Sequence, residues 1–109
     1  MRFLMTINGG GPAADEHLYA EMGRFIEELT NAGILLATGG LAMEGTHAVA
    51  SGGRVTLTDG PYTESKETIV SFALVDVRSK EEAIELTHRF WAIVKDGEGD
   101  MRQVFGPES

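Results

Sequence analysis

The sequence predicts an α+β protein of the ferredoxin-like type, a split βαβ sandwich with an inserted hairpin, in a single domain over residues 1–109. Two long stretches carry apolar residues at helical spacing, and several shorter stretches alternate or are continuously apolar. In chain order the elements are strand, helix, strand, hairpin, strand, helix and strand. A chain of this length removes about two thirds of its unfolded surface from water, which suffices for one core.

The first strand and the first helix are predicted at residues 2–7 and 15–32. In the strand, Phe3, Met5 and Ile7 share one face. Asn-Ala-Gly at 31–33 gives the helix its stop signal. Its apolar stripe consists of Leu18, Met22, Phe25, Ile26 and Leu29.

A second strand is predicted at residues 34–38, interrupted by Gly39-Gly40 and resumed at 41–43. The glycine pair indicates a bulge or a close approach of backbones. Strands 46–50 and 54–58 then form a hairpin around Ser-Gly-Gly at 51–53. Asp59-Gly60-Pro61 is predicted to be a further turn, because glycine accepts unusual backbone angles and proline fixes its own φ.

The strand at 69–77 is apolar on both faces, whereas a strand with one face in water would alternate more cleanly. The second helix opens at a capping box in which Ser79 and Glu82 each bond the other's backbone N–H. This helix ends near residues 95–97, and a last strand covers 101–105.

Right-handed crossovers place both helices on one face of the sheet. The other face would then be bare, although its strands are apolar, and monomers seldom expose apolar patches that continuous. We therefore expect a two-fold homodimer in which the bare faces of two copies pack together.

Composition excludes several classes of function. The chain has no cysteine, which removes disulfides, thiolate metal sites and cysteine nucleophiles. Its net charge is −8, with nine bases among seventeen acids, so no nucleic-acid partner is expected. Apolar runs are too short for a membrane span or a signal peptide, which predicts a cytoplasmic protein with no membrane partner.

Polar residues gather at positions 58–67. If the chain after Pro61 is extended, Tyr62, Glu64 and Lys66 point the same way. With Asp59 they form a candidate binding site, in which Lys66 is a candidate general base. The simpler alternative, which we favour, is that Asp59 caps its own turn and that Glu64 and Lys66 form an exposed ion pair.

Other candidate site residues lie on the second helix. His88 is a second acid–base candidate, although an exposed structural role is commoner for such a residue. Trp91 could line a ligand cavity between helices and sheet, but aromatic residues at helical spacing are more often plain core. The same two readings apply to Phe90, Met22 and Phe25. No metal or cofactor is expected, because metal-ligand spacing is absent among His17, His47 and His88.

The chain resembles the YCII-related proteins, and in particular their DGPF-motif subgroup. The residues that carry the resemblance are Asp59-Gly60-Pro61-Tyr62 and Glu64-Ser65-Lys66-Glu67. The subgroup usually shows Asp-Gly-Pro-Phe, a variable residue and Glu-Thr-Lys-Glu, so Tyr62 adds one hydroxyl. Supporting matches lie at residues 3–5, 32–33, 96–99 and 102–105, so the likeness runs nearly from end to end.

The resemblance implies a dimeric α+β barrel and a regulatory association with extracytoplasmic-function sigma factors. Some YCII-like relatives have a His on the first helix and an Asp before the last strand as a suggested catalytic pair. In this chain the first position falls near Met22 and the second within residues 90–93, where neither residue occurs. That activity is therefore not expected here.

Two functions remain open from the sequence. We favour a homodimeric module that binds a small molecule or a regulatory protein partner without robust catalysis. The alternative is a dimeric α+β barrel enzyme acting on a small polar or aromatic metabolite. Its acid–base group would be Lys66 or His88, and its positioning group Asp59 or Glu64.

Overall fold

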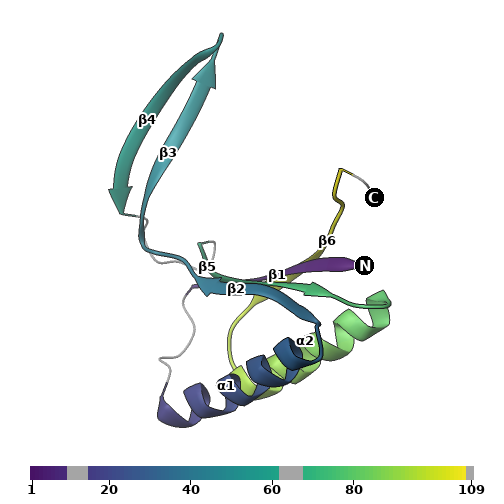
Figure 1. Ribbon diagram of the computed structural model, residues 1–109. Helices are drawn as coiled ribbons and strands as arrows, with labels where there is room; N and C mark the ends of the chain where they lie inside the picture. The colour runs from purple at the N-terminus through teal and green to yellow at the C-terminus, as the bar shows by residue number, and fades with distance from the viewer. Residues whose placement is uncertain (10–14, 62–67, 108–109) are drawn as a thin grey trace.

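The computed structural model describes residues 1–9, 15–61 and 68–107. A four-stranded antiparallel sheet in the order β2-β5-β1-β6 carries both helices on one side, and the hairpin β3-β4 stands apart from it (Figure 1). This arrangement is consistent with the predicted ferredoxin-like α+β fold. The elements are β1 Arg2–Asn8, α1 Glu16–Asn31, β2 Leu35–Gly40, β3 Glu44–Ser51, β4 Arg54–Pro61, β5 Ile69–Asp76, α2 Lys80–Val94 and β6 Gly99–Val104.

The core lies between the helices and the two central strands. Phe3 of β1 is paired with Val75 of β5, and both side chains are buried. The predicted alternation of β1 is confirmed at its first half, because Phe3 is buried while Leu4 is half-buried. The remaining buried apolar side chains are Phe25, Leu29, Val77, Ala83 and Leu86.

Helix α1 begins and ends where its sequence signals predict. Asp15 is the N-cap, and its Oδ1 accepts a hydrogen bond of 2.8 Å from the backbone N–H of Leu18. At the other end Gly33 has a φ of +74°, and the N–H of Ile34 donates to the carbonyl of Leu29. This pattern is a Schellman motif, which glycine favours because it has no Cβ.

Helix α2 confirms half of the predicted capping box. The Ser79 hydroxyl accepts a hydrogen bond of 3.1 Å from the backbone N–H of Glu82. The predicted second hydrogen bond, in which the Ser79 N–H donates to the Glu82 carboxylate, does not form. That carboxylate instead accepts a hydrogen bond of 3.0 Å from Arg78 Nε, so an ion pair replaces the second half of the capping box.

The prediction for the second strand needs correction. Strand β2 runs through Gly39 and Gly40 without a break, and residues 41–43 are not a strand. The register shift lies earlier, between Leu35 and Ala37. The predicted close approach does occur, but to a ring: a Cβ on Gly39 would stand 3.4 Å from Phe72.

The hairpin prediction is confirmed, while the turn predicted after it is wrong. Gly52 and Gly53 both have positive φ, as a tight hairpin turn requires. Asp59, Gly60 and Pro61 are the last three residues of β4, and Gly60 pairs with Gly45 without a positive φ. Pairing along the ribbon has overridden the local turn preference of these residues.

Strand β6 closes the sheet at its edge. It pairs antiparallel with β1 from Gly99 opposite Ile7 to Val104 opposite Arg2. A Cβ on Gly99 would overlap the carbonyl oxygen of Thr6, so only glycine fits at this point. Neither of the two described helices is long and apolar enough to cross a membrane.

Candidate functional site

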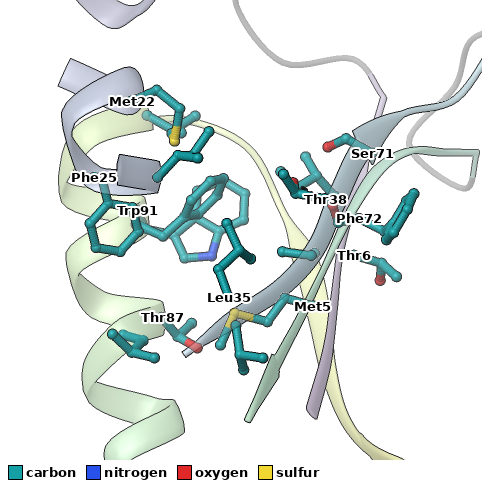
Figure 2. Close-up of a pocket in the computed structure, with 18 of the residues that line it drawn as sticks. Met5, Thr6, Met22, Phe25, Leu35, Thr38, Ser71, Phe72, Thr87 and Trp91 are labelled. Atoms are coloured by element: carbon teal, nitrogen blue, oxygen red, sulfur yellow. Dashed lines mark hydrogen bonds between the residues drawn. The ribbon is translucent and has the colours of Figure 1, made fainter. Parts of the chain in front are cut away.

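A cavity of about 540 Å³ lies between the helices and the sheet, toward the end where β6 begins (Figure 2). Its walls are mainly apolar side chains from the two helices and from the four strands of the sheet. The helices contribute, among others, Leu18, Met22, Phe25, Phe90, Trp91 and Val94. The sheet contributes, among others, Met5, Ile7, Leu35, Ala73, Val75 and Met101.

Trp91 dominates the helical wall. Its indole ring extends from α2 toward the sheet (Figure 2). It meets Phe90 edge to face, with ring centroids 5.1 Å apart and an interplanar angle of 85°. The backbone of Gly97 lies close to the indole ring, because a Cβ at this position would be 3.0 Å from an indole carbon. No described residue accepts a hydrogen bond from the Trp91 N–H.

Two of the five hydroxyl groups in the described wall are already occupied by hydrogen bonds within the protein. Thr38 donates to the carbonyl of Phe72 at 2.9 Å, and Thr87 donates to the carbonyl of Ala83 at 2.9 Å. The Ser71 hydroxyl has no hydrogen-bond partner among the described residues. The cavity therefore offers a ligand few polar groups, chiefly this hydroxyl and the Trp91 N–H.

Ionisable side chains are scarce in the wall. Among the described lining residues, Tyr19 and Asp100 are the ionisable ones, and the Tyr19 side chain is exposed. Asp100 pairs with Thr6, whose side chain points away from the helices (Figure 2). The neighbouring Phe72 ring points the same way (Figure 2). The side chains of Thr6 and Phe72 therefore lie on the side of the sheet that faces away from the helices. No described Lys, Arg or His lines the cavity.

The sequence candidates are dispersed. Trp91 lies in the cavity wall, whereas His88 is exposed on α2 and lies outside that wall. Asp59 does not cap a turn: its Oδ1 accepts a hydrogen bond of 2.6 Å from the Thr46 hydroxyl across the hairpin. Tyr62, Glu64 and Lys66 lie outside the described residues.

Neither of the other two histidines gathers carboxylates around it. His47 is exposed on β3 opposite Thr58, and His17 is exposed on the first turn of α1 beside Glu21. In the described ranges no three His, Asp or Glu side chains come close enough together to hold a metal ion.

The strongest electrostatic pair lies on the helical surface, outside the cavity wall. Hydrogen bonds from the Arg89 guanidinium lower the pKa of the Glu28 carboxyl below its usual 4.5. The same bonds raise the pKa of the Arg89 guanidinium. The pair joins α2 to α1 without offering a titratable group to a ligand.

Several residues of the site gave no functional signal in the sequence. Met5 and Leu35 look like ordinary strand core, and Gly97, which lies against Trp91 and outside the wall, looks like an ordinary helix stop. Whether an apolar side chain meets another side chain or an open space depends on how far the helices stand from the sheet, and periodicity does not encode that distance.

Comparison with known proteins places the whole described fold within one family. The family model for the YCII-related domain matches residues 1–105, which include every strand, both helices and the cavity. Among curated proteins the chain finds no match.

Proposed function

The chain belongs to the YCII-related domain family, and from this premise we propose that it is a binding domain for a small, uncharged, largely aromatic or aliphatic molecule. The ligand occupies the cavity between α1, α2 and the sheet. The single observation that carries the proposal is that this cavity of about 540 Å³ is walled by apolar and aromatic side chains. Pockets for small molecules commonly measure about 300–1,000 Å³ and have such walls with few polar groups.

The scarcity of charge in the wall favours an uncharged ligand. An anion transferred into this cavity would lose its hydration and meet no described Lys, Arg or His side chain. The net charge of −8 adds repulsion at long range. An uncharged ring system loses little hydration and gains contact with Trp91, Phe90 and Phe25.

The Trp91 N–H favours a ligand that carries a hydrogen-bond acceptor. Trp91 is half-buried, and no described residue accepts a hydrogen bond from its indole N–H, so this group is free to donate to a ligand. A carbonyl or ether oxygen on the ligand would satisfy it, and the Ser71 hydroxyl is a second polar contact on the opposite wall.

Binding is favoured over the catalytic alternative by where the acid–base candidates lie. General acid–base catalysis requires a titratable group within hydrogen-bond reach of the substrate. His88 is exposed and does not line the cavity, although Thr87 and Trp91 of the same helix do. This placement supports a binding role for the cavity without catalysis by His88.

A homodimer and membership of the DGPF-motif subgroup are part of the same proposal. The sheet face opposite the helices carries the half-buried apolar side chains of Leu4, Phe72 and Leu74. Packing of this face against the same face of a second copy would remove them from water. The subgroup assignment is supported by Asp59-Gly60-Pro61, which closes the hairpin at the end of β4.

The cavity is tested by titration with N-phenyl-1-naphthylamine, an uncharged probe that fluoresces in apolar sites. Energy transfer from Trp91, the one tryptophan of the chain, reports binding beside that residue. Ala73→Leu narrows the cavity from the sheet side and is expected to weaken probe binding about tenfold, because the added three carbon atoms take space from the aromatic probe. Ala92→Leu, on the exposed side of α2, is the matched control and should bind as the parent does. Absence of energy transfer in the parent, or equal binding by Ala73→Leu, contradicts the proposal.

A further inference from the structure

The hairpin β3-β4 is a two-stranded ribbon that stands away from the body of the domain (Figure 1). Its strands pair with each other and with no other described strand. Every residue of the two strands is exposed except Gly45, which is half-buried. A lone two-stranded ribbon is marginally stable in water, so this one is expected to pack against something.

The two faces of the ribbon differ in chemistry. Cross-strand pairing places Ala48 opposite Leu57 and Ala50 opposite Val55 on one face, which we call the apolar arm face. Val55 and Leu57 are 62% and 64% exposed. The other face is mostly polar and carries His47, Thr56 and Thr58 beside Val49.

The exposed area of the chain matches the requirement of a dimer. A compact monomer of this mass exposes about 5,900 Å² and has a radius of gyration of about 13 Å. The chain exposes 7950 Å² and has a radius of gyration of 16.1 Å. The excess of about 2,000 Å² lies within the share that one subunit buries in a large obligate interface.

The low charge of the hairpin allows a second copy of the chain to pack against it. Residues 44–61 carry one base and two acids, whereas α1 and α2 together carry three bases and seven acids. Two copies that met through their helices would bring those acids together. Two copies that meet through the hairpin and the uncovered sheet face keep them apart.

We propose that the β3-β4 hairpin is an arm that closes over a second copy of the chain and buries the apolar arm face against it. The arm extends on the side of the sheet that the helices leave uncovered (Figure 1). The arm and the uncovered sheet face can therefore contact the same second copy. A two-fold axis lets each copy offer its arm to the other. The inference rests on the proposed homodimer and adds that the arm contributes to its affinity.

The test compares matched substitutions on the two faces of the ribbon by sedimentation equilibrium. Val55→Thr combined with Leu57→Thr removes apolar area while keeping residues that favour strands. We expect this pair to weaken dimerisation at least about tenfold. Val49→Thr, on the other face, is the control and should leave the dimer constant unchanged. An unchanged constant for the double variant overturns the arm proposal.

Two further measurements separate the arm from the dimer itself. Leu74→Thr, on the uncovered sheet face, weakens the homodimer whether or not the arm takes part. A dimer sensitive to Leu74→Thr and insensitive to the arm variant leaves the homodimer standing without the arm, whereas a monomeric parent overturns both. Hydrogen exchange of the parent needs no variant: amides of residues 44–61 should lose protection on dilution together with the dimer. Protection that does not depend on concentration also overturns the arm.

Discussion

Arg89 on α2 forms a bidentate ion pair with Glu28 on α1, through both terminal nitrogens of its guanidinium group. Its Nη1 lies 2.7 Å from Glu28 Oε2, and its Nη2 lies 2.8 Å from Oε1. The guanidinium carbon also stands 4.9 Å from the centroid of the Phe25 ring, which lines the cavity on its other side. One bidentate pair therefore bridges the two helices beside an aromatic residue of the cavity wall.

The first prediction concerns acid. Because the pKa of Glu28 is lowered in the folded protein, its stabilisation is complete above the usual 4.5 and disappears as pH falls through the lowered value. Glu28→Gln should therefore melt at a lower temperature than the parent near neutral pH, and the two should converge in strong acid. Both side chains are substantially exposed, so the difference should be small and should shrink in high salt.

The control for that experiment is Glu27→Gln. Glu27 is an exposed neighbour on α1 and forms no ion pair within the described part of the chain. Its substitution should leave the pH profile of the melting temperature close to that of the parent. Equal profiles for the Glu27 and Glu28 variants would show that the Arg89 pair contributes nothing to stability.

The second prediction concerns the glycine behind Trp91. Gly97 has a φ of +138°, and a Cβ there would be 3.0 Å from the indole. Gly97→Ala should cost about 1–3 kcal/mol and shift the Trp91 emission, because the ring must move. Gly33→Ala meets open space at a φ of +74°, so it should cost about 1–2 kcal/mol and leave the emission unchanged. Unchanged emission in Gly97→Ala would refute the seating of the indole.

The third prediction separates core from surface on one helix. Leu86 is 6% exposed and Ile84 is 40% exposed, both on α2. Leu86→Ala should lower the free energy of unfolding by about 2–5 kcal/mol, because it removes packed atoms and enlarges the cavity. Ile84→Ala should cost less than about 1 kcal/mol, since its side chain is already in partial contact with water. Chemical denaturation of the two variants checks this order, which a reversed ranking would contradict.

The fourth prediction tests the indole N–H as a ligand contact. Trp91→Phe keeps an aromatic ring and removes the donor. Binding of 1-acetonaphthone, which has a carbonyl acceptor, should weaken by about 0.5–1.5 kcal/mol, the usual worth of one hydrogen bond. Binding of naphthalene, which has no acceptor, should change much less. Calorimetric titration of both probes decides the point, and an equal loss for the two would assign the effect to ring contact alone.

The fifth prediction concerns the two polar candidates that lie away from the cavity wall. Asp59→Ala and His88→Ala should each bind N-phenyl-1-naphthylamine as the parent does, because neither residue lines the cavity. Asp59→Ala should instead speed amide exchange in the hairpin, since it removes the bond from Thr46. A large loss of probe binding in either variant would mean that these groups reach the ligand.

Much of the fold could be predicted because its boundaries depend on local chemistry. The α1 stop at Gly33 and the α2 cap at Ser79 each need only a few neighbouring residues, and both occur. Asp59-Gly60-Pro61 failed because a partner thirteen residues earlier, Thr46, bonds Asp59 and extends the ribbon. Pairing across a hairpin competes with local turn preference, and a turn signal read alone ignores it.

The candidate site could be predicted only in part. Trp91 was predicted to be either plain core, which was favoured, or part of a cavity wall, because a single large aromatic on an inner helical stripe suits either role. Leu35 and Ala73 could not be singled out, since the open space that they border arises from the separation of the two layers. His88 was a candidate because it neighbours Phe90 and Trp91, but its own side chain is exposed and does not line the cavity. How a helix is rotated against the sheet is set by packing and cannot be told from those neighbours alone.

Gly99, at the start of β6, helps to set the register in which β6 pairs with β1. If the strand slipped by one residue against β1, Glu98 or Asp100 would have to place a Cβ where Gly99 now faces the Thr6 carbonyl, and that space is already filled. One-residue slips are therefore opposed by steric overlap and not merely by weaker packing. Gly99 thus favours the observed alignment of β6 against β1, in which it lies opposite Ile7.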